Sequence, residues 1–227
     1  MKTTNIKPSG IDWIDDIPAE WEVTRIKYSY SFFTGWTPPT KDDVSYLDEN
    51  MWANISDIGD CKILENTENR ISDTAVKESN ICISEKGSLL FSFKLSIGLV
   101  SFAGNNMYTN EAIATFPLEN PCLSFFYYSA PLFIVKNSNE NIYGAKMLNQ
   151  DLIKNAFILF PPISEQKEMA NYLDTECAKI DTIINEKQQS IETMQSYKKS
   201  LIYEYTTGKK RTIDVRSHHA SGREVKK

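Results

Sequence analysis

A long apolar repeat constrains the fold of this 227-residue chain more than any other feature of its sequence. Positions spaced alternately by three and four residues carry nine apolar side chains and two lysines: Ala170, Leu173, Cys177, Ile180, Ile184, Lys187, Ile191, Met194, Lys198, Leu201 and Tyr205. A period of 3.5 residues kept over about five heptads is typical of a helix that winds against another helix. Pro161-Pro162 precede the repeat and Gly208 follows it. The pattern predicts one helix from Ser164 to about Thr206, about 65 Å long.

A helix of this length cannot bury its apolar seam against itself, so the repeat predicts a partner helix. The expected interface consists of Leu173, Ile180, Ile184, Ile191, Met194 and Leu201. The seam lysines, Lys187 and Lys198, weaken the pairing of identical helices but can set register or direction. A long amphipathic hairpin arm or a domain-capping helix is the alternative interpretation.

The rest of the chain has the composition of one globular domain. With 41% hydrophobic residues, we expect one globular domain in residues 1–160, the long helix in 161–207 and a basic tail in 208–227. We find no apolar run long enough to span a membrane and no hydrophobic leader, so we expect a cytoplasmic protein.

Charge is distributed unevenly along the chain. Residues 1–163 carry 13 basic and 20 acidic side chains, whereas residues 164–227 carry 12 and 10. An acidic globular part argues against non-specific binding to nucleic acid, which depends on neutralising phosphates. It leaves open a local patch that reads bases, and the tail after Gly208 is a candidate for phosphate contact.

Hydrophobic periodicity predicts a mixed α/β (α+β) domain before the helix. Residues 23–33 favour a strand or a short helix, 65–79 are compatible with a helix, 121–135 predict a buried helix and 137–149 a surface loop. Trp13 and Trp21 indicate an N-terminal segment that packs on the domain. Strands are expected at 51–58, 81–83, 88–93, 97–102, 112–116 and 156–160.

The residue types needed for catalysis are scarce in the globular part. Both histidines, His218 and His219, lie in the tail, and no glycine-rich phosphate loop is present. Glu165 and Lys167 have a nuclease-like spacing, but capping of the long helix explains Glu165. Four separated cysteines, Cys61, Cys82, Cys122 and Cys177, are expected to be reduced packing residues rather than disulfides or metal ligands. We therefore expect a binding protein, not an enzyme.

Several segments resemble, in order, the DNA specificity subunit of type I restriction-modification systems. They are SGIDWIDDIPAEWEV at residues 9–23 and the shorter motifs at 35–38, 52–58, 86–92, 97–98 and 109–112. Most specific is the Pro-Pro-x-x-Glu-Gln junction at 161–166 with the helix after it. The family's subunit has two target recognition domains and two helices that pack antiparallel, and this chain has one of each. The resemblance therefore implies a half-length form.

The resemblance also implies partners. They are double-stranded DNA, a methyltransferase (modification) subunit that uses S-adenosylmethionine, and an ATP- and Mg-dependent restriction endonuclease or translocase subunit. This chain would hold no cofactor or metal itself. It would read one half of a bipartite target and form a homodimer through the long helix. The alternatives are a coiled-coil adaptor that does not touch DNA, and a decoy half-subunit that pairs with a full-length one.

Candidate base contacts are loop residues that present donors, acceptors or aromatic rings to the major groove. Each is also compatible with an ordinary surface role, and Trp36 with a plug of the domain. The candidates are Trp36, Thr37, Lys41, Ser92, Lys94, Ser96, Asn110, Lys146 and Asn149.

Overall fold

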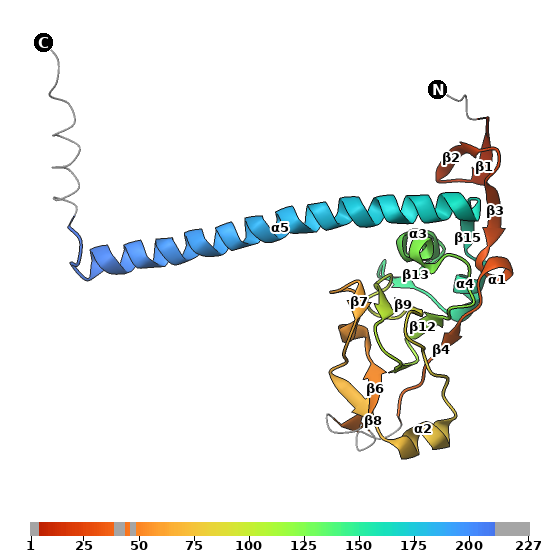
Figure 1. Ribbon diagram of the computed structural model, residues 1–227, viewed down its shortest axis with the longest axis horizontal. Helices are drawn as coiled ribbons and strands as arrows, with labels where there is room; N and C mark the ends of the chain where they lie inside the picture. The colour runs from red at the N-terminus through yellow and green to blue at the C-terminus, as the bar shows by residue number, and fades with distance from the viewer. Residues whose placement is uncertain (1–4, 39–43, 46–48, 212–227) are drawn as a thin grey trace, which may run out of the picture. The chain divides into compact units, whose positions relative to one another are not determined.

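The computed structural model describes residues 5–38, 44–45 and 49–211 (Figure 1). It contains a mixed α/β domain followed in the chain by one long helix, as the sequence predicts. The chain divides into two compact units, residues 1–171 and 172–227, and each is described by itself. Among the described residues, no helix is both long enough and apolar enough to cross a membrane.

A five-stranded sheet forms the centre of the first unit. Its order is β4 (Phe33–Thr34), β12 (Ile113–Phe116), β9 (Leu89–Ser92), β10 (Val100–Ala103) and β7 (Ile63–Leu64). Neighbouring strands are antiparallel except β10 and β7. β9 is the middle strand, with Leu90 opposite Thr115 of β12 and Ser101 of β10.

Strand β9 is buried on both faces, so the five-stranded sheet is the middle one of three layers. Leu89 and Phe91 join the core under helix α3 (Leu123–Lys136), while Leu90 joins a second core with Ala53 and Ile113. That second core is covered by a four-stranded sheet in the order β11 (Tyr108–Thr109), β6 (Asn50–Ala53), β8 (Asn69–Ile71) and β5 (Val44–Ser45). Figure 1 shows the sequence of layers from α3 through β9 and β12 to β6 and β8.

Aromatic rings fill the core beneath α3. The ring of Tyr30 stacks on Phe126 with a centroid distance of 3.9 Å, and Phe116 meets Phe126 edge-on at 4.9 Å. Burial raises the pKa of the Tyr30 phenol, and the nearby Cys122 adds to the effect. The phenol therefore stays neutral, and no charge is buried among the aromatic rings.

Residues 6–18 form a hairpin. β1 (Ile6–Ile11) pairs antiparallel with β2 (Ile14–Pro18). Trp13 at its turn packs against Phe133 of α3, with ring centroids 5.3 Å apart. This contact confirms that the segment packs on the domain through a tryptophan.

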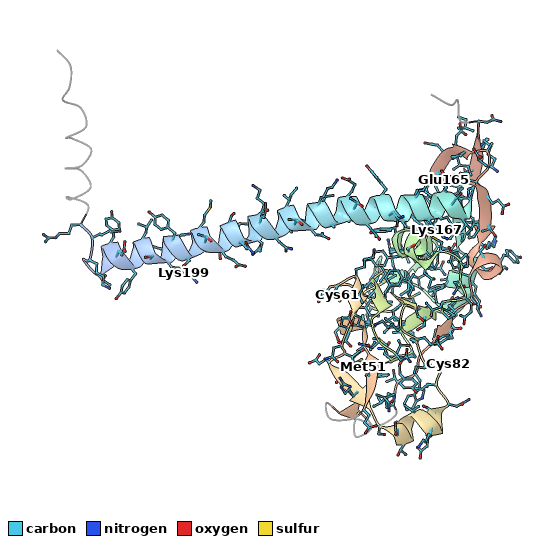
Figure 2. The ribbon with its side chains drawn as sticks, in the orientation of Figure 1. Met51, Cys61, Cys82, Glu165, Lys167 and Lys199 are labelled. Atoms are coloured by element: carbon cyan, nitrogen blue, oxygen red, sulfur yellow. The ribbon has the colours of Figure 1, made fainter. Side chains whose placement is uncertain are left out.

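The chain enters and leaves the domain through one strand pair. β3 (Glu22–Arg25) pairs antiparallel with β15 (Phe157–Phe160), immediately before helix α5 (Ile163–Thr206). Trp21 Nε1 donates a hydrogen bond of 2.9 Å to Glu165 Oε2. Glu165, which is labelled in Figure 2, lies in the first turn of α5. Gln166 and Ala170 are buried. The first two turns of α5 thus belong to the globular unit, which extends to Asn171 rather than to residue 160.

Short elements complete the described part of the domain. They are α1 (Ile26–Ser29), the 3-10 turn η2 (Ile55–Asp57), α2 (Asp73–Ser79), β13 (Asn139–Glu140), β14 (Lys146–Met147) and α4 (Gln150–Asn155).

The structure corrects three expectations. Residues 81–83 form no strand, and only Ser84 makes an isolated bridge, to Met107. The expected loop at 137–149 contains the β13–β14 hairpin. Cys61 and Cys82 are exposed rather than packed, whereas Cys122 and Cys177 are partly buried; all four are free thiols.

Gly35 is required by a close approach between two backbone segments. Its N–H donates to the Ile113 carbonyl at 3.4 Å, and a Cβ built on it would overlap the carbonyl group of Thr109. We expect Gly35→Ala to lower the free energy of unfolding by about 3 kcal/mol, because backbone cannot move aside as a side chain can. Urea denaturation measures the change.

The matched control is Gly10→Ala. Gly10 has a φ of +71° but no atom within 4 Å of its built Cβ, so it should lose only about 1 kcal/mol, from backbone conformation alone. Equal losses at the two positions would show that the overlap at Gly35 is relieved at no cost.

Candidate nucleic-acid interface

Two neighbouring hollows lie at one end of the central sheet. The first hollow has a volume of about 590 Å³ and is lined by side chains from three segments, within residues 54–60, 94–99 and 110–112. The second hollow, of about 360 Å³, is lined by Thr34, residues 93–94, Glu111 and residues 148–150. Lys94 and Glu111 line both. The two hollows are therefore adjacent and share one pair of charged residues.

A partly buried amide pair joins two segments that line the first hollow. Asn110 Nδ2 donates to Asn54 Oδ1 at 2.5 Å, and Asn110 Oδ1 accepts from the N–H of Ala112 at 3.0 Å. Asn54 also caps η2, with its N–H bonded to Asp57 Oδ2 at 2.8 Å. These bonds join two motifs that are 56 residues apart in sequence and leave Asn110 only 7% exposed.

Lys94 and Glu111 stand at the boundary of the two hollows. Lys94 Nζ lies 3.8 Å from a Glu111 carboxylate oxygen, and both side chains are about half exposed (49% and 50%). A pair this exposed adds little stability, because water screens it. Both groups are thus available to a ligand.

The charges of the first hollow suit base edges better than phosphates. Its charged lining residues are one lysine, Lys94, and two acids, Asp60 and Glu111. Phosphate binding would favour cations alone, whereas base edges in the major groove present both acceptors and donors. The hollow offers complementary groups of both kinds.

The structure brings four of the residues proposed from sequence to these hollows. Lys94, Ser96 and Asn110 line the first, and Lys94 and Asn149 line the second. Asn149 also accepts a hydrogen bond of 2.8 Å from the N–H of Leu152, as the N-cap of α4. Asn110 is committed to the amide pair described above, so its role is to shape the hollow.

Ser92 is a correction to the sequence-based set. Its side chain is buried, with 0% exposure. Its hydroxyl donates to the carbonyl of Ser96 and accepts from the N–H of Leu99 at 3.1 Å. A group buried and bonded in this way cannot reach a base, and Ser92 instead shapes the loop after β9.

The remaining candidates lie elsewhere or outside the described residues. Trp36 is half-buried, with its N–H bonded to the Thr109 carbonyl at 2.9 Å and its own carbonyl accepting from Trp52 Nε1 at 3.0 Å. Thr37 beside it is exposed, and Lys146 is exposed on β14. Lys41 lies outside the described residues.

Sequence reasoning missed several polar residues that line the hollows. They are Asn54, Ser56, Asp60, Glu111 and Gln150. Gln150 bonds Thr34 Oγ1 at 3.1 Å across the second hollow. The signal that could have found three of them was present, because Asn54, Ser56 and Glu111 belong to the motifs at 52–58 and 109–112.

Among the described residues, no group of three or more His, Cys, Asp or Glu side chains could hold a metal ion. Glu165, whose spacing from Lys167 resembles a nuclease site, is instead bonded to Trp21.

A second candidate surface is the apolar stripe of α5. Ile180, Ile184, Ile191 and Met194 are 55%, 56%, 48% and 70% exposed, while Leu173 and Leu201 are partly buried. Lys199 lies near the far end of the same unbroken helix (Figure 2). Exposed aliphatic side chains that repeat between Ile180 and Met194 of this 44-residue helix have the form of an unsatisfied helix-pairing seam.

Comparison with protein families identifies the chain. Residues 18–193 match the model of the type I restriction modification DNA specificity domain. Because that match covers most of the chain, this protein belongs to the type I restriction-modification DNA specificity family. The resemblance seen in the sequence is thereby confirmed.

Individual relatives agree with this assignment. The chain is 29% identical over 189 residues to the type I restriction enzyme MjaIX specificity subunit of Methanocaldococcus jannaschii, covering 78% of this chain and 42% of the relative. Its fold resembles a chain solved in a study of the assembly and conformational transition of the type I R-M system, with a TM-score of 0.65 at 15% identity, covering 86% of this chain and 47% of that one.

A third similarity is to the HsdS subunit from Thermoanaerobacter tengcongensis. The TM-score is 0.57 at 16% identity, over 78% of this chain and 41% of that one. The chain thus spans less than half the length of each of these three proteins.

Asn110→Ala tests the amide pair. Removing Asn110 leaves the buried N–H of Ala112 without its partner and removes one of the two hydrogen bonds to Asn54 Oδ1, so we expect the free energy of unfolding to fall by about 2 kcal/mol. Lys94→Ala at the same hollow should change it by less than about 0.5 kcal/mol, because its ion pair is exposed. Urea denaturation of both variants measures the difference, and comparable losses would contradict the assigned roles.

Proposed function

We propose that this chain is a sequence-specific DNA-binding specificity subunit that reads one half of a bipartite target. The observation that carries the proposal is the convergence of Lys94, Ser96, Glu111 and Asn149 on two adjacent hollows with both donors and acceptors. Family membership supports DNA as the ligand. The globular unit would be the target recognition domain.

The long helix would hold two such domains at a fixed separation. Its seam is nearly symmetric about Lys187, so an antiparallel pair centred there sets Leu173 against Leu201, Ile180 against Met194 and Ile184 against Ile191. The methylene groups of Lys187 would cover the seam, and its ammonium group would extend into solvent. A second copy of this chain is therefore a suitable partner, and the resulting two-fold dimer would read a palindromic bipartite site.

Catalysis would belong to other subunits. A methyltransferase subunit with S-adenosylmethionine and an ATP-dependent endonuclease subunit would act where this chain directs them. The excess of acidic side chains in residues 1–163 fits this division, because a DNA-reading subunit in a larger complex need not supply most of the phosphate neutralisation itself.

One observation favours a second candidate function. The excess of acidic over basic side chains in residues 1–163 is also expected of a coiled-coil adaptor that never touches DNA. An adaptor and a reader differ in one measurable property, which is selection of a motif from random duplexes.

Selection of duplexes from a randomised pool at moderate salt tests DNA reading. We expect the 227-residue chain to enrich a short motif, and its affinity to fall by about 1–3 kcal/mol with Lys94→Ala, mainly through lost preference at one base pair. Quantitative band-shift measurements on the selected duplex give the affinities.

Lys77→Ala on α2 is the matched control, since it removes the same charge at an exposed position outside both hollows. Enrichment of no motif would favour the adaptor. A uniform loss over all sequences with Lys94→Ala would assign that lysine to phosphate rather than to a base.

Pairing through α5 is tested by charge on the seam. Ile184→Asp together with Ile191→Asp should convert a dimer into a monomer, because positions 184 and 191 face each other in the pair and carboxylates there would replace two aliphatic contacts with like charges. Multi-angle light scattering gives the mass. Gln189→Asp, on the opposite face of the helix, should remain dimeric, and an unchanged dimer in the double variant would contradict this interface.

A further inference from the structure

The tip of the loop between β9 and β10 carries an unusual leucine. Leu95 is 91% exposed, although it is one of the large apolar side chains of the domain. It also adopts a φ of +59°, in the left-handed region that residues with a Cβ rarely occupy. Both its exposure and its backbone conformation are unfavourable for leucine, so folding alone does not account for it.

A hydrogen-bond framework fixes this conformation. The buried Ser92 hydroxyl donates to the Ser96 carbonyl and accepts from the N–H of Leu99, and the N–H of Gly98 donates to the Ser92 carbonyl at 2.9 Å. The N–H of Ile97 bonds the Leu95 carbonyl at 3.0 Å. These hydrogen bonds hold the base of the loop, so Leu95 at its tip is exposed to solvent in a defined conformation.

The surroundings of Leu95 indicate the kind of ligand. It lines the first hollow together with Lys94, Asp60 and Glu111. Ile55, Ile58 and Leu99 also line this hollow but are buried or half-buried, so Leu95 is its one large apolar side chain that stands exposed among the charged groups. One exposed apolar group beside charges offers little to a protein partner, whose buried contact would exclude charges. It matches the edge of DNA in the major groove, where a lysine donates to guanine, a carboxylate accepts from cytosine and an apolar group touches the thymine methyl.

We propose that Leu95 is a specificity-determining residue that contacts the 5-methyl group of a thymine in the target half-site. This inference rests on the proposed function, because it requires that the chain reads DNA. It adds the chemical feature that is read and the residue that reads it. Strain at a functional position is a familiar cost of presenting a side chain outward.

Deoxyuridine substitution tests the contact directly. In the selected duplex each thymine is replaced in turn by deoxyuridine, which lacks only the methyl group. Wild-type affinity should fall about fourfold at one position, the effect of one buried methyl group. With Leu95→Gly this penalty should disappear, whereas Leu95→Met, which keeps an apolar side chain, should retain it.

Two controls separate recognition from folding. Leu132→Ala removes another exposed leucine, on α3 and outside the hollow, and should keep the full deoxyuridine penalty. Leu95→Gly should not lower the midpoint of thermal unfolding, because glycine adopts the left-handed conformation without strain. Loss of binding together with retained stability would assign Leu95 to the ligand.

The results separate the role of Leu95 from the proposed reading of DNA. If wild type enriches no motif, both are overturned. If it enriches a motif but no thymine is sensitive to loss of its methyl group, or the penalty persists in Leu95→Gly, DNA reading stands and the role of Leu95 is overturned.

Discussion

Burial of strand β9 on both faces is the constraint from which the domain is arranged. Leu89 and Phe91 hold α3 on one side, and Leu90 holds the four-stranded sheet on the other. With both faces closed, the end of the strand is where its hairpin reaches solvent. The loop that follows Ser92 is therefore anchored in the core at its base and presented at its tip, and the two hollows form around it.

The sequence predicted the features that rest on periodicity. The heptad repeat places α5 correctly to within a residue of Ile163–Thr206, and the runs around β9, β10, β12 and β15 are found as strands. Ser92 was misplaced because a strand buried on both faces lacks the alternation that separates inward from outward residues. The amide pair of Asn54 and Asn110 was missed because it joins distant segments, which periodicity cannot relate.

Exposed apolar side chains are arranged differently in the long helix and in the domain. Along α5, the aliphatic side chains of Ile180, Ile184, Ile191 and Met194 repeat with one period, so one partner helix of similar period would cover these four. At the loop after β9, one exposed leucine stands beside charged groups, while the other large apolar residues of the same hollow are buried or half-buried. The first arrangement suits stable pairing, and the second suits discrimination between ligands that differ by one small group.

The antiparallel pair of β3 and β15 has a consequence for how such chains diversify. Because Glu22 lies opposite Phe160, the segment between them begins and ends at the same place. The pair therefore fixes the point at which the polypeptide enters α5, and loops between the two strands can differ in length without moving that junction.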